Sequence, residues 1–218
     1  SGTALGWFPA GEAITGEHLV AGDAVIGLPS SGVHSNGYTL LRAIVDKSGL
    51  SLSDTAPFDT DHPGREIEGV TDSSPTLGEV LLNPTRIYVD PIIDLIDSCR
   101  QGNGPCASED IKAIAHITGG GLSNLLRLHD SLGWHISNPL PIPPEFNWMA
   151  DTGPVENLEM HRVFNMGMGM CIAVSAGVAE KVENWLTESL SGTRIVGVVT
   201  DDVHRVTHAD SEIVFDHY

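Results

Sequence analysis

Lysine is scarce in this sequence, and acidic residues far outnumber basic ones. The 218 residues include 29 Asp and Glu against 11 Lys and Arg, a formal net charge of −18. The only lysines are Lys47, Lys112 and Lys181. This charge makes nucleic acid and anionic membranes poor partners. It is typical of a protein exposed to high salt, where repulsion maintains solubility, or of an ordinary acidic cytosolic protein.

Long apolar runs and targeting signals are also missing. No stretch of about 18 apolar residues occurs. The first residues, SGTALGWFPAGEAI, lack the basic start and the apolar stretch of a secretory signal. We therefore predict a soluble, cytoplasmic protein with no membrane partner.

Cysteine is scarce as well, and metal-ligand spacings are absent. Cys99, Cys106 and Cys171 form no C-x-x-C pair, so neither a disulfide framework nor zinc ligation is predicted. Reduced thiols are the expectation, with closure of a short loop between Cys99 and Cys106 as the disfavoured alternative. The dispersed His and acidic residues match no H-E-x-x-H spacing, and no G-x-S-x-G elbow occurs. The sequence thus predicts no metal site in this chain.

Glycine and proline divide the chain into a connector and one domain. Residues 1–17 contain Gly2, Gly6, Pro9, Gly11 and Gly16, which interrupt every periodic pattern. We interpret them as an irregular connector and residues 18–218 as one compact domain, because a 41% hydrophobic content suffices for a full core. Residues 50–76, rich in Asp, Pro, Ser and Thr, are expected to form a long surface excursion with room for mobility.

Apolar periodicity predicts alternating strands and helices in the rest of the domain. Strands are expected within residues 18–29, 111–117, 166–174 and 193–200, and helices within 38–48, 78–82, 85–99, 122–130, 155–164 and 175–190, before a terminal hairpin. Ser35 or Asn36 is expected to cap the first helix, and Gly49 to end it. The alternation indicates an α/β layered domain.

Two glycine-containing loops each join a predicted strand to a predicted helix. They are S-S-G-V-H-S-N-G at residues 30–37 and T-G-G-G at residues 118–121. Glycine lets the backbone approach a ligand closely, and free amides at a helix start suit phosphate. A tight turn without a ligand is the alternative for each loop.

Polar residues near these loops suggest a site for a phosphorylated substrate. His34, Ser35 and Asn36 lie in the first loop, and His116 and Thr118 flank the second. Histidine can transfer a proton, or donate a hydrogen bond to a developing oxyanion, near neutral pH. Helix capping by His34 and a satisfied strand-end role for His116 are the alternatives.

Two further residues are candidates for ligand contact. Arg86 follows Pro84-Thr85 at the start of a predicted helix, where it could pair with phosphate or with an acidic neighbour. Asn165 precedes Gly167 and Gly169, which alternate with methionines as in a strand with one small-residue edge. That edge fits either ligand approach or close backbone packing.

Five blocks of sequence, in order, resemble one known enzyme family. GDAVIGLPSSGVHSNGYTLLR, LLNPTRIYV, IKAIAHITGGGLSNLLR, PEFNWM and VFNMGMGMCIAV span most of residues 18–175. They are similar to the carboxy-terminal domain of phosphoribosylformylglycinamidine cyclo-ligase, also called aminoimidazole ribonucleotide synthetase. The resemblance implies an α+β domain with a layered mixed β-sheet packed with helices.

The resemblance also implies an activity and its site residues. The family closes formylglycinamidine ribonucleotide to aminoimidazole ribonucleotide in purine biosynthesis, with ATP and magnesium. Carried onto this chain, it makes His34 and His116 catalytic, as proton-transfer or oxyanion-stabilising residues, with the division of roles open. It places Ser35, Asn36, Gly37, Thr118, Gly119, Gly120 and Gly121 at the substrate; with Ser31, Gly32, Arg86 and Asn165 these form the predicted substrate-binding set.

The family's ATP- and magnesium-binding motifs have no counterpart in these residues. Residues 1–17 resemble the exit from the family's amino-terminal ATP-binding half, which also makes much of its homodimer contact. The resemblance thus implies a substrate-side fragment that is inactive alone. The alternatives are a non-catalytic ribotide-binding or assembly module, or a superfamily relative such as formylglycinamide ribonucleotide amidotransferase, selenophosphate synthetase or the hydrogenase maturation protein.

Overall fold

The structure, a computed structural model, describes residues 3, 5–63, 65–70 and 74–218. These residues build a seven-stranded sheet in the order β2-β4-β1-β5-β3-β6-β7. The strands are β1 (Ala24–Pro29), β2 (Ile111–His116), β3 (Gly133–Ile136), β4 (Met168–Val174), β5 (Arg194–Thr200), β6 (Val206–His208) and β7 (Val214–Phe215). The β3–β6 pairing is parallel and the other pairings are antiparallel.

This pairing corrects the α/β interpretation and confirms the α+β class with a mixed sheet. Strands and helices do alternate along the chain, as periodicity predicted. However, each strand enters the sheet mostly antiparallel to its neighbours, so the alternation does not produce parallel crossover units. Periodicity reports which side chains are buried and carries no information on strand direction.

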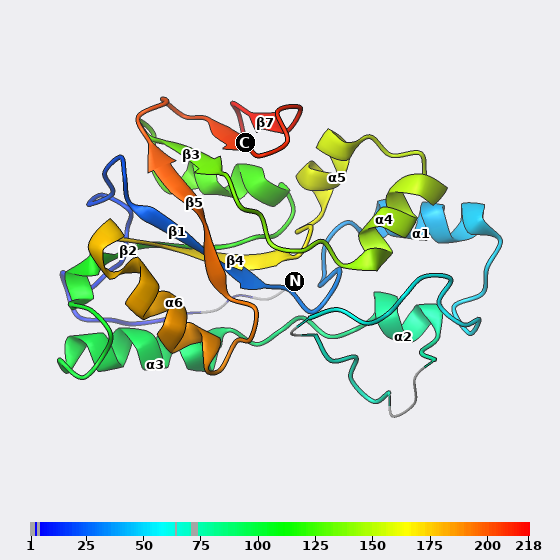
Figure 1. The fold of residues 1–218 in the computed structure, drawn as a ribbon, viewed down its shortest axis with the longest axis horizontal. Coiled ribbons are helices and arrows are strands. Elements are labelled where there is room, and N and C mark those ends of the chain that lie inside the picture. The colour runs from blue at the N-terminus through cyan, green and yellow to red at the C-terminus, as the bar shows by residue number, and fades with distance from the viewer. Residues whose placement is uncertain (1–2, 4, 64, 71–73) are drawn as a thin grey trace.

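Helices cover both faces of the sheet. The α-helices are α1 (Tyr38–Ser48), α2 (Leu77–Leu81), α3 (Val89–Arg100), α4 (Pro144–Thr152), α5 (Asn157–Val163) and α6 (Ala179–Thr187), joined by the 3₁₀ segments η1 (Ser108–Asp110), η2 (Gly121–Arg127) and η3 (Ala176–Val178). Figure 1 shows α3 and α6 side by side along one side of the sheet, with α1, α2 and α4 gathered beyond one end of it.

The strand β1 shows how the core is divided between the two faces. Every residue of β1 is buried. Val25 packs with η2 and β3, whereas Ile26 and Leu28 pack with α3 and α6. Because side chains alternate across a strand, an unbroken apolar run is expected where both faces are covered. A third cluster joins α1, α2, α4 and α5.

Several predicted boundaries are wrong in informative ways. Neither Ser35 nor Asn36 caps the first helix: its N-cap is Gly37, with no side-chain cap bond, while Gly49 ends it as predicted. The helix expected from residue 85 begins at Val89, so Arg86 precedes it. The helix expected at 122–130 is the 3₁₀ segment η2. The short strand β3 was not predicted at all.

The amino-terminal segment is irregular and attached to the domain. The described residues before Ala24 form no helix or strand. Gly16 N–H donates to Lys112 O (3.1 Å), and Arg100 contacts Glu12 through a backbone hydrogen bond (2.9 Å) and an ion pair (3.3 Å). Its identity as a connector from another domain stays a prediction.

The excursion at residues 50–76 is irregular but anchored. Apart from a bridge between Thr55 and Thr76, its described residues form no helix or strand. The Arg65 side chain is nevertheless only 1% exposed and forms an ion pair with Glu145. Most of the described residues of the excursion are exposed or half-exposed, as expected of a surface segment, and Arg65 anchors this segment to the domain.

Candidate functional site

The loop after β1 is fixed by hydrogen bonds to distant parts of the chain. Ser31 Oγ donates to Pro84 O (2.6 Å), and Asn83 Nδ2 donates to Ser31 O (2.7 Å). Ser35 Oγ and Thr85 Oγ1 are 3.2 Å apart. The P-T-R segment and the first glycine loop thus form one unit.

His34 is held in an unusual backbone conformation. Its φ is 59°, in the left-handed region that only some non-glycine residues adopt readily. The Ser31 N–H donates to His34 Nε2 at 3.1 Å. Because Nε2 is then an acceptor, the neutral ring carries its proton on Nδ1, a tautomer inferred from the network. His34 Nδ1 is buried, with no hydrogen-bond partner among the described residues.

Electrostatics keep His34 neutral at physiological pH. Burial, followed by the charges of His116 and Arg86, lowers the pKa of His34 to about 4. Burial also lowers the pKa of His116, although its residue surface is more exposed. The two ring centroids are 6.3 Å apart. The site therefore offers one buried, neutral N–H donor and one accessible imidazole.

The two glycine loops meet directly. Gly119 N–H donates to Asn36 Oδ1 at 3.0 Å, so the amide expected to cap α1 instead reaches across to the second loop. Asn124 supports that loop by donating from Nδ2 to Gly121 O (2.7 Å) and by accepting the Thr118 hydroxyl at Oδ1 (3.1 Å). The structure thus brings His34, Asn36, His116 and the 118–121 segment together.

Different structural reasons explain glycine at the three consecutive positions 119–121. Gly120 and Gly121 have φ of 105° and 55°, and a Cβ on Gly121 would overlap the backbone of His161 and Phe164. Those two positions are explained by the turn itself. Gly119 is exposed, and a Cβ there would meet only Asn36 Oδ1 at 3.8 Å. Gly119 is therefore the glycine whose open side faces the joined loops.

Sequence reasoning missed Tyr88, although it lies in the quoted LLNPTRIYV block. Its ring lies edge-on to both imidazoles, with centroids 6.1 Å from His34 and 5.9 Å from His116. Its hydroxyl donates to Pro29 O (2.9 Å), and burial raises its pKa. A Cβ on Gly169 would strike the Tyr88 ring and His34. Close packing, rather than ligand approach, explains this glycine of the G-M-G stretch.

Asn165 has an internal role. Its Nδ2 donates to Gly32 O (2.8 Å), and its Oδ1 accepts from Gly167 N–H (2.9 Å), while the residue is 4% exposed. Both ends of the amide are used in positioning the first loop. Gly32 is buried as well, and a Cβ there would lie 3.3 Å from Glu145 Oε1. Asn165 and Gly32 are therefore buried residues that support the conformation of the first glycine loop.

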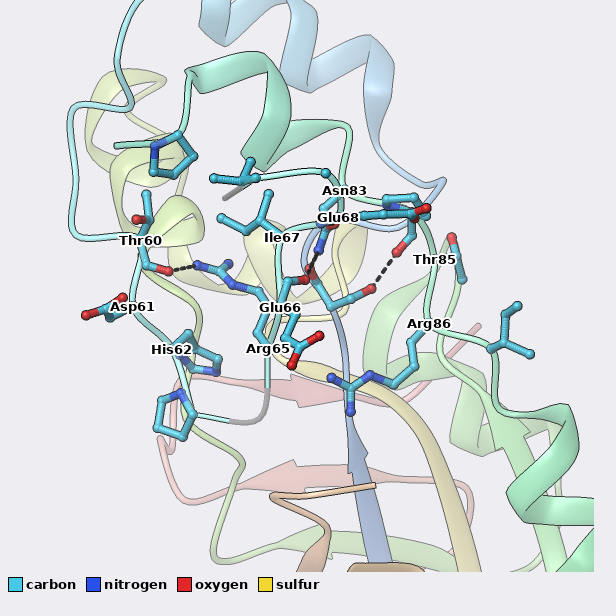
Figure 2. A pocket seen from close by; sticks show the side chains of 17 residues that line it. Thr60, Asp61, His62, Arg65, Glu66, Ile67, Glu68, Asn83, Thr85 and Arg86 are labelled. Atoms are coloured by element: carbon cyan, nitrogen blue, oxygen red, sulfur yellow. Dashed lines mark hydrogen bonds between the residues drawn. The ribbon is translucent and has the colours of Figure 1, made fainter. Parts of the chain in front are cut away.

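A cavity of about 980 Å³ borders the first glycine loop at Ser31. One wall is the Asn83–Ile87 segment with Ser31, and the other is residues 60–63 and 65–70 of the excursion. Figure 2 shows the Arg86 side chain extending from the first wall toward the segment that carries Arg65 and Glu66. A neighbouring cavity of about 590 Å³ shares Ser31 and Arg86 and adds Ser189 and Ser191.

The excursion wall is held by a buried ion pair and by Asn83. Arg65 Nη1 donates to both Glu145 oxygens (2.5 and 2.7 Å), and its Nη2 donates to Thr60 O (2.6 Å). Asn83 donates to Glu66 O (3.0 Å) and accepts from Glu68 N–H (3.0 Å). Burial raises the pKa of Glu145, an effect that Arg65 opposes. Sequence pattern gave no signal for this wall, because Arg65 and Glu145 are 80 residues apart.

Metal and membrane features are not found in the described residues. No group of three or more His, Cys, Asp or Glu there could hold a metal ion. No helix formed by those residues is both long and apolar enough to cross a membrane.

Comparison with known proteins supplies the family context. The family model for "AIR synthase related protein, C-terminal domain" matches residues 20–209. The phosphoribosylformylglycinamidine cyclo-ligase of Methanosarcina mazei is 37% identical over 206 residues, covering 94% of this chain and 53% of the relative. That of Methanococcoides burtonii is 38% identical over 214 residues, covering 98% and 55%. The chloroplastic enzyme of Arabidopsis thaliana is 40% identical over 185 residues, covering 84% and 41%.

The chain spans about half the length of the archaeal relatives it matches. Among solved structures, the hydrogenase maturation protein HypE is similar, with a TM-score of 0.47 and 18% identity. That match covers 88% of this chain and 51% of HypE.

Proposed function

Because the chain belongs to the family of AIR synthase related proteins, as their C-terminal domain, we propose that it is the substrate-side half of a phosphoribosylformylglycinamidine cyclo-ligase. The reaction closes formylglycinamidine ribonucleotide to aminoimidazole ribonucleotide in purine biosynthesis. The observation that carries this proposal is the junction of the two glycine loops at Asn36 and Gly119, with both imidazoles beside it. The cyclo-ligase names of the relatives support it.

Different chemistry is proposed for the two histidines. His34 acts as a neutral hydrogen-bond donor, because the Ser31 amide occupies Nε2 and leaves a buried, unpaired Nδ1–H. A donor of this kind stabilises negative charge that develops on a substrate oxygen. His116 is the more accessible ring and acts in proton transfer during ring closure. The Asn36 side chain and Tyr88 position these groups.

The phosphate of the ribotide is assigned to the loop amides and Arg86. The open side of Gly119 allows an anion to approach the backbone. Arg86 extends into the cavity beside Ser31, and a guanidinium can bind phosphate through two parallel hydrogen bonds. The ribotide would thus span from the cavity to the two imidazoles.

ATP and Mg²⁺ are proposed to be held by a part of the enzyme outside these residues. The described residues contain no carboxylate cluster fit for a metal ion, so we assign no Mg²⁺ ligand here. When bound, ATP would activate the formyl oxygen for departure as phosphate. An ATP-binding half, and a homodimer of complete enzymes, are the proposed partners.

Reconstitution tests this function. The chain is titrated with formylglycinamidine ribonucleotide by calorimetry, then mixed with the separately produced amino-terminal half of the Methanosarcina mazei relative and assayed for ring closure. We expect binding, and activity that falls at least tenfold in His116→Asn. His18→Asn is the matched control, since that side chain is 77% exposed and pairs with the neighbouring Glu17. Binding without activity in the mixture would favour a non-catalytic ribotide-binding module.

A further inference from the structure

Two of the three cysteines lie against each other, away from the imidazoles. Cys99 is in the last turn of α3 and is 4% exposed, and Cys106 is half-buried in the loop that follows. Their Sγ atoms are 3.5 Å apart. Both are free thiols, and Cys171 is a third, fully buried in β4.

The loop between the two cysteines is folded tightly over Cys99. Gly102 N–H donates to Cys99 O (3.1 Å), and the amides of Asn103 and Gly104 both donate to Ser98 O (2.9 and 2.8 Å). A Cβ on Gly104 would lie 2.6 Å from Cys99 Sγ. Glycine at that position therefore lets the backbone turn directly over the sulfur and returns Cys106 to it.

The surroundings of Cys106 make the thiol slow to react. Burial, its hydrogen bond with Cys99 and the nearby charges of Cys99, Asp110 and Glu109 raise the pKa of Cys106 to about 12. The thiolate is the nucleophile in disulfide exchange, so a raised pKa slows attack without preventing the bond from forming at equilibrium. The pair is therefore unsuited to rapid peroxide sensing.

We propose that Cys99 and Cys106 form a reversible intramolecular disulfide when exposed to a small-molecule disulfide. The Cys106 thiolate attacks one sulfur of that disulfide, breaking its S–S bond and releasing one thiol. The Cys99 thiolate then attacks Cys106 Sγ in the mixed disulfide, releasing the second thiol. Two protein thiols are oxidised, one small disulfide is reduced to two thiols, and the protons leave with those thiols.

The bond would clamp the end of α3 to the entrance of β2. The loop after Cys106 leads through η1 into β2, which starts at Ile111 and ends at His116. The clamp thus lies at the end of β2 opposite the imidazole. Cross-linking restricts the unfolded chain, so oxidation is expected to raise the melting temperature and to leave ribotide affinity unchanged.

Thiol accounting tests the proposal. The folded chain is equilibrated with oxidised glutathione, quenched with N-ethylmaleimide and digested for mass spectrometry. We expect a peptide cross-linked between Cys99 and Cys106, with a loss of two hydrogen atoms in the intact mass and Cys171 alkylated only after unfolding. The melting temperature should rise, and dithiothreitol should reverse that rise. Cys106→Ala should show neither the cross-link nor the reversible rise.

Two results would overturn the proposal. One is that both thiols remain free at equilibrium in a strongly oxidising glutathione buffer. The other is that glutathione stays attached to Cys106 with no cross-link to Cys99. Both are read on the wild-type chain, so the test does not depend on the folding of any variant, and neither depends on the cyclo-ligase assignment.

Discussion

At the scale of single residues, the proposed site contains a histidine with a constrained backbone and a side chain held by a hydrogen bond. His34 combines φ of 59° with a hydrogen bond from the Ser31 amide and a buried Nδ1. Backbone strain and an unpaired buried donor each oppose folding. Such costs are retained where the structure gains a function from them, and we propose that the function here is hydrogen-bond donation by His34 to a substrate oxygen.

The lowered pKa of His34 predicts a loss of stability on acidification. The folded value of about 4 lies below the ordinary value of 6.5, so the unfolded chain binds more protons between these two pH values. The stability contributed by a neutral His34 is complete above pH 6.5 and is lost as the pH falls toward 4. Urea unfolding at pH 7 and pH 5 should show the wild type losing on the order of 2 kcal/mol more than His34→Asn.

Asparagine is the suitable replacement because it tolerates the left-handed conformation and does not titrate. His208, whose pKa burial and His161 lower to about 4, contributes an acid sensitivity common to both proteins. Equal losses in the wild type and the variant would show that His34 is not held neutral.

Substitutions at Gly119 and Gly121 distinguish a glycine needed for ligand binding from one needed for the turn. Gly119→Ala adds a methyl group in open space beside Asn36, so unfolding free energy should change by less than about 0.5 kcal/mol while ribotide affinity falls roughly tenfold. Gly121→Ala, with φ of 55° and no room for Cβ, should lose about 1–3 kcal/mol of stability. Calorimetry and urea unfolding measure the two effects. Unchanged affinity in Gly119→Ala would remove the loop amide from the site.

At the scale of elements, a buried ion pair between Arg65 and Glu145 attaches the cavity wall formed by residues 60–63 and 65–70 to helix α4. The Arg65 and Glu145 side chains are 1% and 0% exposed. Removing one partner of such a pair leaves an unpaired buried charge, which is strongly destabilising, whereas replacing both with apolar residues is often tolerated.

A pair of variants tests the attachment. Arg65→Met should destabilise the chain by about 3–5 kcal/mol, and Arg65→Met combined with Glu145→Met should recover most of that loss. Denaturant unfolding gives both values. A double variant no more stable than the single one would mean that the hydrogen bond to Thr60 O, rather than the ion pair, holds the wall.

Elements with strong local patterns were predicted from the sequence, and those set by distant contacts were not. The strands at Ala24–Pro29, Ile111–His116 and Arg194–Thr200 and the helix ending at Gly49 follow from apolar spacing and glycine. The short strand β3 exists because it pairs with β5 and β6. The same holds for the candidate site. The glycine loops could be predicted from local sequence, whereas the positions of Tyr88 and Arg65 depend on contacts with residues far apart in the chain.

At the scale of the whole molecule, self-repulsion is the main electrostatic feature. The net charge of −18 is distributed over 218 residues. Screening shortens the range of repulsion to about 10 Å at 0.1 M salt and about 3 Å at 1 M. If the acidic surface is an adaptation to high salt, the melting temperature should climb steeply from low salt to 2 M NaCl. A flat response in calorimetric scans would contradict that origin.

The domain has a complete core although it spans only about half of its archaeal relatives. Three buried clusters fill the two faces of the sheet and the helical end formed by α1, α2, α4 and α5 (Figure 1). Such a chain should fold alone and hold its loops in place. If this chain binds the ribotide and another half of the enzyme binds ATP, as proposed, the isolated chain should bind the ribotide. Ring closure should then occur only when the ATP-binding half is present.

The two joined loops are proposed to form one ribotide site. Titration of the ¹⁵N-labelled chain with formylglycinamidine ribonucleotide, followed through the amide resonances by NMR, tests this site most directly. Saturable shifts are expected in residues 31–37 and in residues 118–121 together, with the Gly119 shift among the largest. The absence of saturable shifts, or shifts confined to surfaces away from both loops, would contradict this proposal.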